Sequence, residues 1–198
     1  MAPKKLTPQQ QLQAQRHLVA TFIGSSRCGK SVLLTSHLFN IFSSFYAPTL
    51  DQVFVADPPV THPHLPAITY VDVGTGPNTS DRFIPLRTQT SDVVVIVFSV
   101  VDKSTLEDAV FRYAVFAKDY NKPIVLVGTK ADLRGPGETL AERTDEVIPW
   151  EAERYAKKIG ATEYVECSAL NEEGMADVFE ALVRAALGEK VRFGEREG

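Results

Sequence analysis

The stretch Gly24-Ser25-Ser26-Arg27-Cys28-Gly29-Lys30-Ser31 is the most informative part of this sequence. It fits the pattern G-x-x-x-x-G-K-S, in which glycines let the backbone approach anionic oxygens and successive amides point at them. An apolar run, 18–23, precedes it and a helical pattern, 30–39, follows it, which is the context that a phosphate-binding loop requires. The expected phosphate ligands in this loop are Gly24, Ser26, Arg27, Cys28, Gly29, Lys30 and Ser31, with the Ser31 hydroxyl also facing Mg²⁺.

Short apolar runs alternate with amphipathic ones along most of the chain, which predicts an α/β domain with a mostly parallel sheet. The expected strands are 18–23, 52–56, 68–72, 93–99, 124–128 and 164–167; 52–56 is the weakest of them and is expected at an edge. The expected helices are 30–39, 106–119, 150–159 and 173–187. The polar segment 134–147 contains Gly-Pro-Gly and is interpreted as a surface excursion.

The size and composition favour one domain. The chain has 198 residues, 44% of them apolar, which is enough for a single core. We expect residues 1–16 to be a flexible extension, 17–188 the domain and 189–198 a tail. The net charge of −4 argues against general nucleic-acid binding, and no apolar run is long enough to span a membrane. Two widely spaced cysteines fit a reducing, cytoplasmic compartment.

A second motif indicates which base the nucleotide carries. Val127-Gly128-Thr129-Lys130-Ala131-Asp132 follows an expected strand. A carboxylate at Asp132 accepts hydrogen bonds from N1–H and N2–H₂ of guanine, whereas adenine offers an acceptor at N1. Guanine therefore fits better than adenine, and we find neither an adenine pocket nor the acceptor-substrate base that a P-loop ATPase or kinase needs.

With these motifs, the chain resembles the Rho/Rac-type small GTPases over about residues 17–188. Those proteins share the T-K-x-D box followed by Asp-Leu-Arg, seen here as Asp132-Leu133-Arg134. The stretch Phe45-Tyr46-Ala47-Pro48-Thr49 resembles their effector loop, and Glu166-Cys167-Ser168-Ala169-Leu170 resembles their S-A-[K/L] loop. The resemblance implies a six-stranded small G-protein fold that binds GTP/GDP with Mg²⁺ and presents switch loops to protein effectors.

The same resemblance assigns further roles, residue by residue. It implies that Thr49 coordinates Mg²⁺ and the γ-phosphate, so that Ser31, Thr49 and Asp72 form the metal set. It also implies that the Gly76 amide meets the γ-phosphate. The implied base-binding residues are Phe42, Thr129, Lys130, Asp132, Ser168, Ala169 and Leu170.

The chain departs from the family at two places that matter for hydrolysis. Where Rho proteins have D-T-A-G-Q, it has Asp72-Val73-Gly74-Thr75-Gly76-Pro77, with one extra residue and with proline in place of the catalytic glutamine. Pro77 has no side-chain amide and no backbone N–H to orient water. Ser26 replaces a glycine that leaves room for that glutamine and for an arginine finger. We therefore expect slow GTP hydrolysis and no catalytic residue in the usual position, unless Arg27, Thr75 or Ser80 substitutes.

The sequence leaves two interpretations of the function open. The first is a GTP-binding switch or scaffold that hydrolyses slowly, and the second is a pseudo-GTPase that binds partners but little nucleotide. The tail 189–198 carries no prenylation motif, so we expect a cytoplasmic protein or one tethered through a partner or a missing C-terminal segment.

Overall fold

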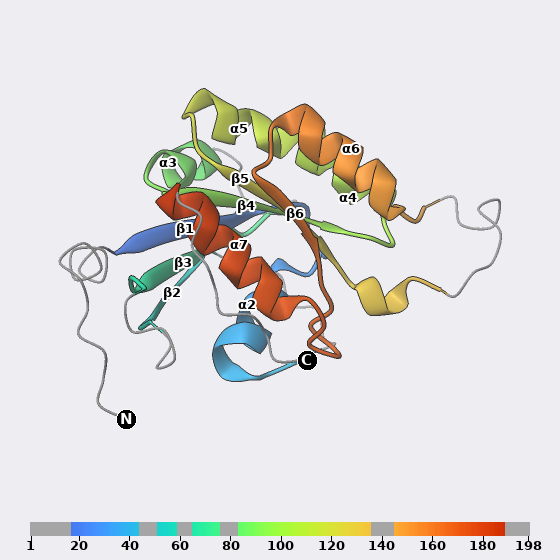
Figure 1. Cartoon of the computed structure of the whole chain (residues 1–198), viewed down its shortest axis with the longest axis horizontal. Helices are drawn as coiled ribbons and strands as arrows, with labels where there is room; N and C mark the ends of the chain where they lie inside the picture. Colours follow the sequence, from blue (N-terminus) through green and yellow to red (C-terminus); the bar gives the residue numbers. More distant parts are fainter. Residues whose placement is uncertain (1–16, 44–50, 59–64, 76–82, 136–144, 189–198) are drawn as a thin grey trace.

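The computed structural model describes residues 17–43, 51–58, 65–75, 83–135 and 145–188. Within these ranges a six-stranded sheet lies between two layers of helices (Figure 1). The strand order is β2-β3-β1-β4-β5-β6, and β2 alone pairs in the antiparallel sense among the described strands. The prediction of a mostly parallel six-stranded α/β sheet is therefore confirmed.

The strands follow the apolar runs closely. Their bounds are β1 (Leu18–Ile23), β2 (Gln52–Ala56), β3 (Ile68–Asp72), β4 (Val93–Ser99), β5 (Ile124–Thr129) and β6 (Glu163–Glu166). Every residue of β4 is buried, whereas β2 is the exposed edge that its weaker apolar pattern predicted. The predicted bounds of β6, 164–167, were one residue too late. Glu163 belongs to the strand because it pairs with Val125, and its charge is met by Arg184.

The helices needed more correction. Their bounds are α2 (Lys30–Phe39), α3 (Ile84–Gln89), α4 (Lys103–Asp108), the π-helical η2 (Ala109–Tyr113), α5 (Ala114–Asp119), the 3₁₀ turn η3 (Ala131–Leu133), α6 (Pro149–Ile159) and α7 (Met175–Leu187). The helix predicted at 106–119 begins at Lys103 because Asp102 caps it, accepting the Ser104 N–H at 3.1 Å. It also contains the π segment, and the helix predicted from Trp150 begins at Pro149. The helix predicted from residue 173 begins at Met175, because Gly174 before it is left-handed (φ 69°).

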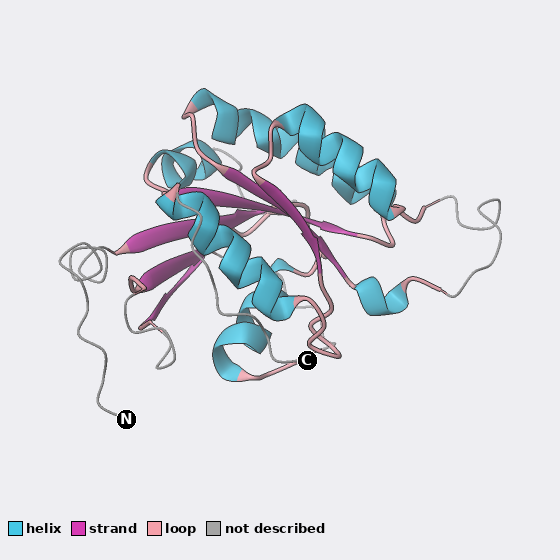
Figure 2. Ribbon diagram, in the orientation of Figure 1, coloured by secondary structure: helices cyan, strands magenta, loops and turns pink. Residues whose placement is uncertain are grey.

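Each face of the sheet has its own apolar core. Helices α2 and α7 cover one face, while α3, α4, α5 and α6 cover the other (Figure 2). Phe22 and Leu182 are fully buried in the first core, and Ile96 and Leu106 in the second. Because β1, β3, β4, β5 and β6 run parallel, their carboxyl ends meet at one edge, where ligands bind in open α/β sheets.

Candidate functional site

The loop between β1 and α2 adopts a backbone that only glycine fits at two points. Gly29 has φ 98°, and a Cβ there would press on the Thr129 side chain. At Gly24 a Cβ would collide with the carbonyl oxygen of Val97. The glycines of the motif therefore let the loop pass close to β4 and β5 before it enters the helix.

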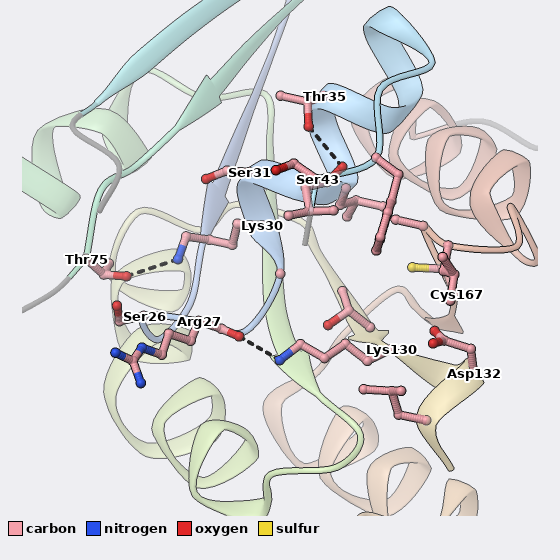
Figure 3. Close-up of a pocket in the computed structure, with 18 of the residues that line it drawn as sticks. Ser26, Arg27, Lys30, Ser31, Thr35, Ser43, Thr75, Lys130, Asp132 and Cys167 are labelled. Carbon is pink, nitrogen blue, oxygen red and sulfur yellow. Dashed lines mark hydrogen bonds between the residues drawn. The ribbon is translucent and has the colours of Figure 1, made fainter. Parts of the chain in front are cut away.

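Lys30 is the first residue of α2; its side chain reaches back to this loop and the residue is 7% exposed. Its Nζ donates to the carbonyl oxygens of Gly24 at 2.7 Å and Ser25 at 3.1 Å, and to the Thr75 hydroxyl at 3.0 Å (Figure 3). Thr75 in turn donates to the Gly24 carbonyl at 2.5 Å. The ammonium is thus held in place inside the loop, as a phosphate ligand must be.

Ser31, at the start of α2, faces Asp72 at the end of β3. The Ser31 hydroxyl donates to Oδ2 of Asp72 at 2.5 Å. Asp72 is fully buried, and Oδ1 has no hydrogen-bond partner among the described residues. Burial raises the pKa of Asp72, while the Ser31 hydrogen bond and the nearby Lys30 charge oppose the rise. This buried pair of hydroxyl and carboxylate oxygens fits Mg²⁺, which prefers oxygen ligands and keeps several of its waters.

The loops after β5 and β6 place a carboxylate at the other end of the site. Asp132 Oδ1 accepts a hydrogen bond of 2.5 Å from the Ser168 hydroxyl, which itself accepts the Leu170 N–H at 3.2 Å. Ser168 is fully buried, so it fixes the rotamer of Asp132. The second carboxylate oxygen of Asp132 accepts no bond from Ser168. A carboxylate held in this way can accept hydrogen bonds from two adjacent N–H groups of a base.

Two contacts join the two motifs. Lys130 Nζ donates to the Arg27 carbonyl at 2.8 Å (Figure 3), and the Thr129 hydroxyl donates to the Cys28 carbonyl. The loop after β5 is thereby fixed relative to the loop between β1 and α2, although about a hundred residues separate them in the sequence.

A single cavity of about 760 Å³ runs between the two motifs. Its size is within the range of about 300–1,000 Å³ found for small-molecule sites. The predicted site residues that line it are Ser26, Arg27, Gly29, Lys30, Ser31, Phe42, Thr129, Lys130, Asp132, Ala169 and Leu170. Figure 3 shows Lys30 and Ser31 toward one end and Asp132 at the other. A buried cation at one end and an oriented carboxylate at the other match the two ends of a guanine nucleotide.

Comparison with known proteins agrees with this geometry. The sequence profile of the Ras family matches residues 19–188. This chain belongs to the Ras family. It is also 37% identical over 168 residues to the GTP-binding protein RHO2 of Saccharomyces cerevisiae, a match that covers 83% of this chain and 86% of that protein. It is therefore a Ras-family GTP-binding switch protein related to the Rho branch, and guanine nucleotide with Mg²⁺ is the ligand of its family.

Several predicted residues support the Ras-family site without lining the cavity. The Gly24 carbonyl accepts a bond from Lys30, Cys28 is a buried residue of the loop, Asp72 accepts a bond from Ser31, and Asp132 accepts one from Ser168. Thr49, Gly76 and Pro77 lie outside the described residues. Among the described helices, none is long and apolar enough to cross a membrane.

Sequence reasoning missed three contacts of this Ras-family site. It did not predict that Thr75 bonds Lys30 or that Ser168 bonds Asp132. It also missed the 2.6 Å bond from the Ser25 hydroxyl to Asp108 on α4. Each contact joins residues that are 36 or more positions apart, and no local pattern signals it.

Proposed function

We propose that this chain is a Rho-type GTP-binding switch that hydrolyses GTP slowly, both alone and with an activating protein. The observation that carries the proposal is that Ser26 lines the phosphate end of the cavity, where the Rho resemblance has glycine. A second support is the sequence itself, which has Pro77 in place of the glutamine that orients the attacking water.

The chemistry explains why these two residues matter. Phosphoryl transfer depends on positioned water and on charge stabilisation, and an arginine finger alone is worth about 10³–10⁵ in rate. Among the described residues that line the cavity, none has a carboxamide side chain. The Ser26 side chain adds bulk where an incoming arginine would need room.

Single-turnover hydrolysis of the GTP-loaded protein with Mg²⁺ tests this proposal. We expect Ser26→Gly combined with Pro77→Gln to raise the rate at least about tenfold, equivalent to about 1.4 kcal/mol of barrier. Ser26→Ala is the matched control, since it keeps a Cβ at this position, and should stay slow. A wild-type rate equal to that of an ordinary Rho protein would refute the proposal.

The remaining assignments are part of the same proposal. The switch domain is residues 17–188, and its effectors bind the loops around Phe42–Thr49 and Gly74–Arg87. The protein acts in the cytoplasm or at a membrane to which a partner or a lipid tethers it. The second candidate, a pseudo-GTPase that binds little nucleotide, predicts that protein purified without added nucleotide releases neither GTP nor GDP on heating.

A further inference from the structure

Thr75, in the segment after β3 that has one extra residue, lies at the phosphate end of the cavity. Thr75 is 9% exposed, and its hydroxyl accepts a hydrogen bond from Lys30 and donates one to the Gly24 carbonyl. Figure 3 shows Thr75 on the far side of Lys30 from Asp132. With guanine at Asp132, the part of a nucleotide nearest Thr75 is the phosphate farthest from the base.

All three N–H donors of the Lys30 ammonium have an acceptor in this arrangement. It has three N–H donors, and three oxygens lie within hydrogen-bond distance: those of Gly24, Ser25 and Thr75. Cys28 Sγ is a fourth, longer contact at 4.0 Å. A further anionic oxygen on Lys30 must therefore displace one acceptor. Thr75 is the acceptor outside the rigid loop, so it is the one that yields.

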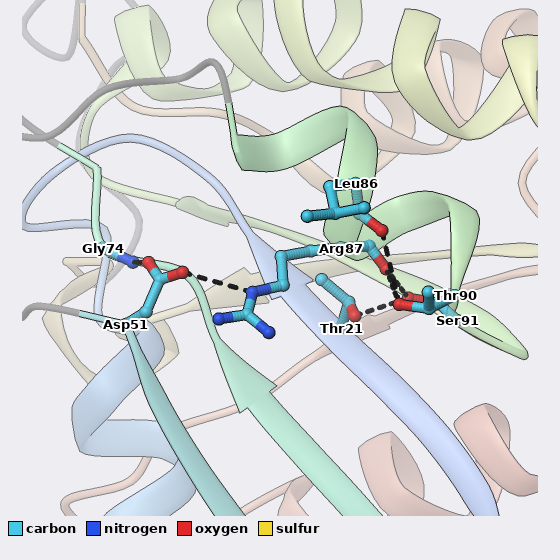
Figure 4. A network of polar contacts seen from close by, with 7 residues as sticks. All are labelled: Thr21, Asp51, Gly74, Leu86, Arg87, Thr90 and Ser91. Atoms are coloured by element: carbon cyan, nitrogen blue, oxygen red, sulfur yellow. Dashed lines mark hydrogen bonds and ion pairs between the residues drawn. The ribbon is translucent and has the colours of Figure 1, made fainter.

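Thr75 is held in place from its other side as well. The N–H of the preceding residue, Gly74, donates to Asp51 Oδ1 at 3.1 Å (Figure 4). Asp51 Oδ2 is 3.3 Å from Nε of Arg87 on α3, and the Arg87 carbonyl accepts the Ser91 hydroxyl at 2.7 Å. Moving Thr75 away from Lys30 therefore strains a second set of contacts.

We propose that the Thr75 hydroxyl is a specificity-determining group that stands in for the outermost phosphate on Lys30 and so biases this site toward the diphosphate. A triphosphate has to displace Thr75 and loosen Asp51 from Gly74, whereas a diphosphate leaves that end of the cavity to Thr75. The inference rests on the proposed guanine-nucleotide function. If hydrolysis is slow, this ratio of affinities sets which nucleotide the protein carries.

The test is the ratio of dissociation constants for GDP and for the non-hydrolysable analogue guanosine 5′-(β,γ-imido)triphosphate, measured by calorimetry with Mg²⁺. Thr75→Ala and Thr75→Val remove the hydroxyl and should shift the ratio about tenfold toward the triphosphate, as expected for one lost hydrogen bond to a charged group. Thr75→Ser keeps the hydroxyl and should match the wild type. Asp51→Ala, which is farther from the phosphates, should shift the ratio in the same direction by a smaller factor.

Each outcome decides the matter. An unchanged ratio in Thr75→Ala, or weaker triphosphate binding in that variant, overturns the inference but leaves the nucleotide-binding function standing. Binding to Thr75→Ala but not to the wild type supports the inference strongly. If no form binds either nucleotide while thermal unfolding shows that all are folded, both the inference and the proposed function fail.

Discussion

The Ser31 hydroxyl donates a 2.5 Å hydrogen bond to Oδ2 of Asp72, and Oδ1 of that buried carboxylate has no partner among the described residues. Ser31 lies in the first turn of α2 and Asp72 ends β3, so the contact joins the start of this helix to the segment that carries Thr75. A fully buried carboxylate with one oxygen that accepts no hydrogen bond destabilises the fold, unless a cation or a water bound to the cation contacts that oxygen.

The first prediction concerns Asp72→Asn in metal-free and nucleotide-free protein. Burial raises the pKa of Asp72 above its ordinary value of 3.8, so the native state favours the protonated form. The wild type should therefore lose stability relative to Asp72→Asn as the pH rises above about 3.8, because only the wild type must ionise a buried group.

Urea unfolding in EDTA at pH 4 and pH 7 measures this difference. Mg²⁺ with GDP should reverse the order at pH 7, stabilising the wild type more than the variant. A stability difference between the two proteins that is the same at both pH values without metal would contradict our account of the carboxylate.

The second prediction concerns His37 on α2. Its ring stacks on Phe179 of α7 with centroids 3.2 Å apart, and this partial desolvation lowers the pKa of His37 from 6.5 to about 4, although the residue as a whole stays exposed. As the pH drops from about 6.5 toward 4, His37 is protonated in the unfolded chain but not in the native state. The free energy of unfolding therefore falls over this range. His37→Phe keeps a flat ring but cannot titrate, so its unfolding free energy should fall less over this range. Parallel pH profiles for the two proteins would count against the prediction.

The third prediction compares two glycines. Gly24→Ala should cost on the order of 3 kcal/mol, since its Cβ would collide with the Val97 carbonyl oxygen. Gly160, at the end of α6, has φ 73° with open space around it, so Gly160→Ala should cost only about 1 kcal/mol of left-handed strain. Chemical denaturation of both variants checks the difference, and equal losses would show that the collision at Gly24 is relieved at little cost.

The fourth prediction concerns base recognition. Asp132→Asn presents an amide where guanine needs an acceptor, and the loss of hydrogen bonds to a charged group should weaken GDP binding at least about 100-fold. Ser168→Ala removes only the hydroxyl that orients Asp132. It should weaken GDP binding less than Asp132→Asn does. Calorimetry measures both, and it would contradict the role of Ser168 if its variant lost more affinity than the Asp132 variant.

The sequence predicted the parts of the site that lie within one motif. Lys30 and Ser31 follow directly from the spacing of their motif, and the apolar runs located the strand that ends at Asp72 and the strand that precedes Asp132. It did not predict the contacts of Thr75 and Ser168, because these depend on how segments distant in the chain meet. The predicted helix starts at residues 106 and 173 were wrong. The helices begin at Lys103 and Met175, because capping by Asp102 and the left-handed Gly174 determine these starts more than apolar periodicity does.

The most direct test of the central claim is calorimetric titration of GDP with Mg²⁺ into protein stripped of nucleotide by EDTA, at two temperatures. We predict saturable binding to one site per chain, strongly weakened by Asp132→Asn. Absence of binding heat at both temperatures in a protein shown to be folded would contradict the assignment of this cavity to a guanine nucleotide.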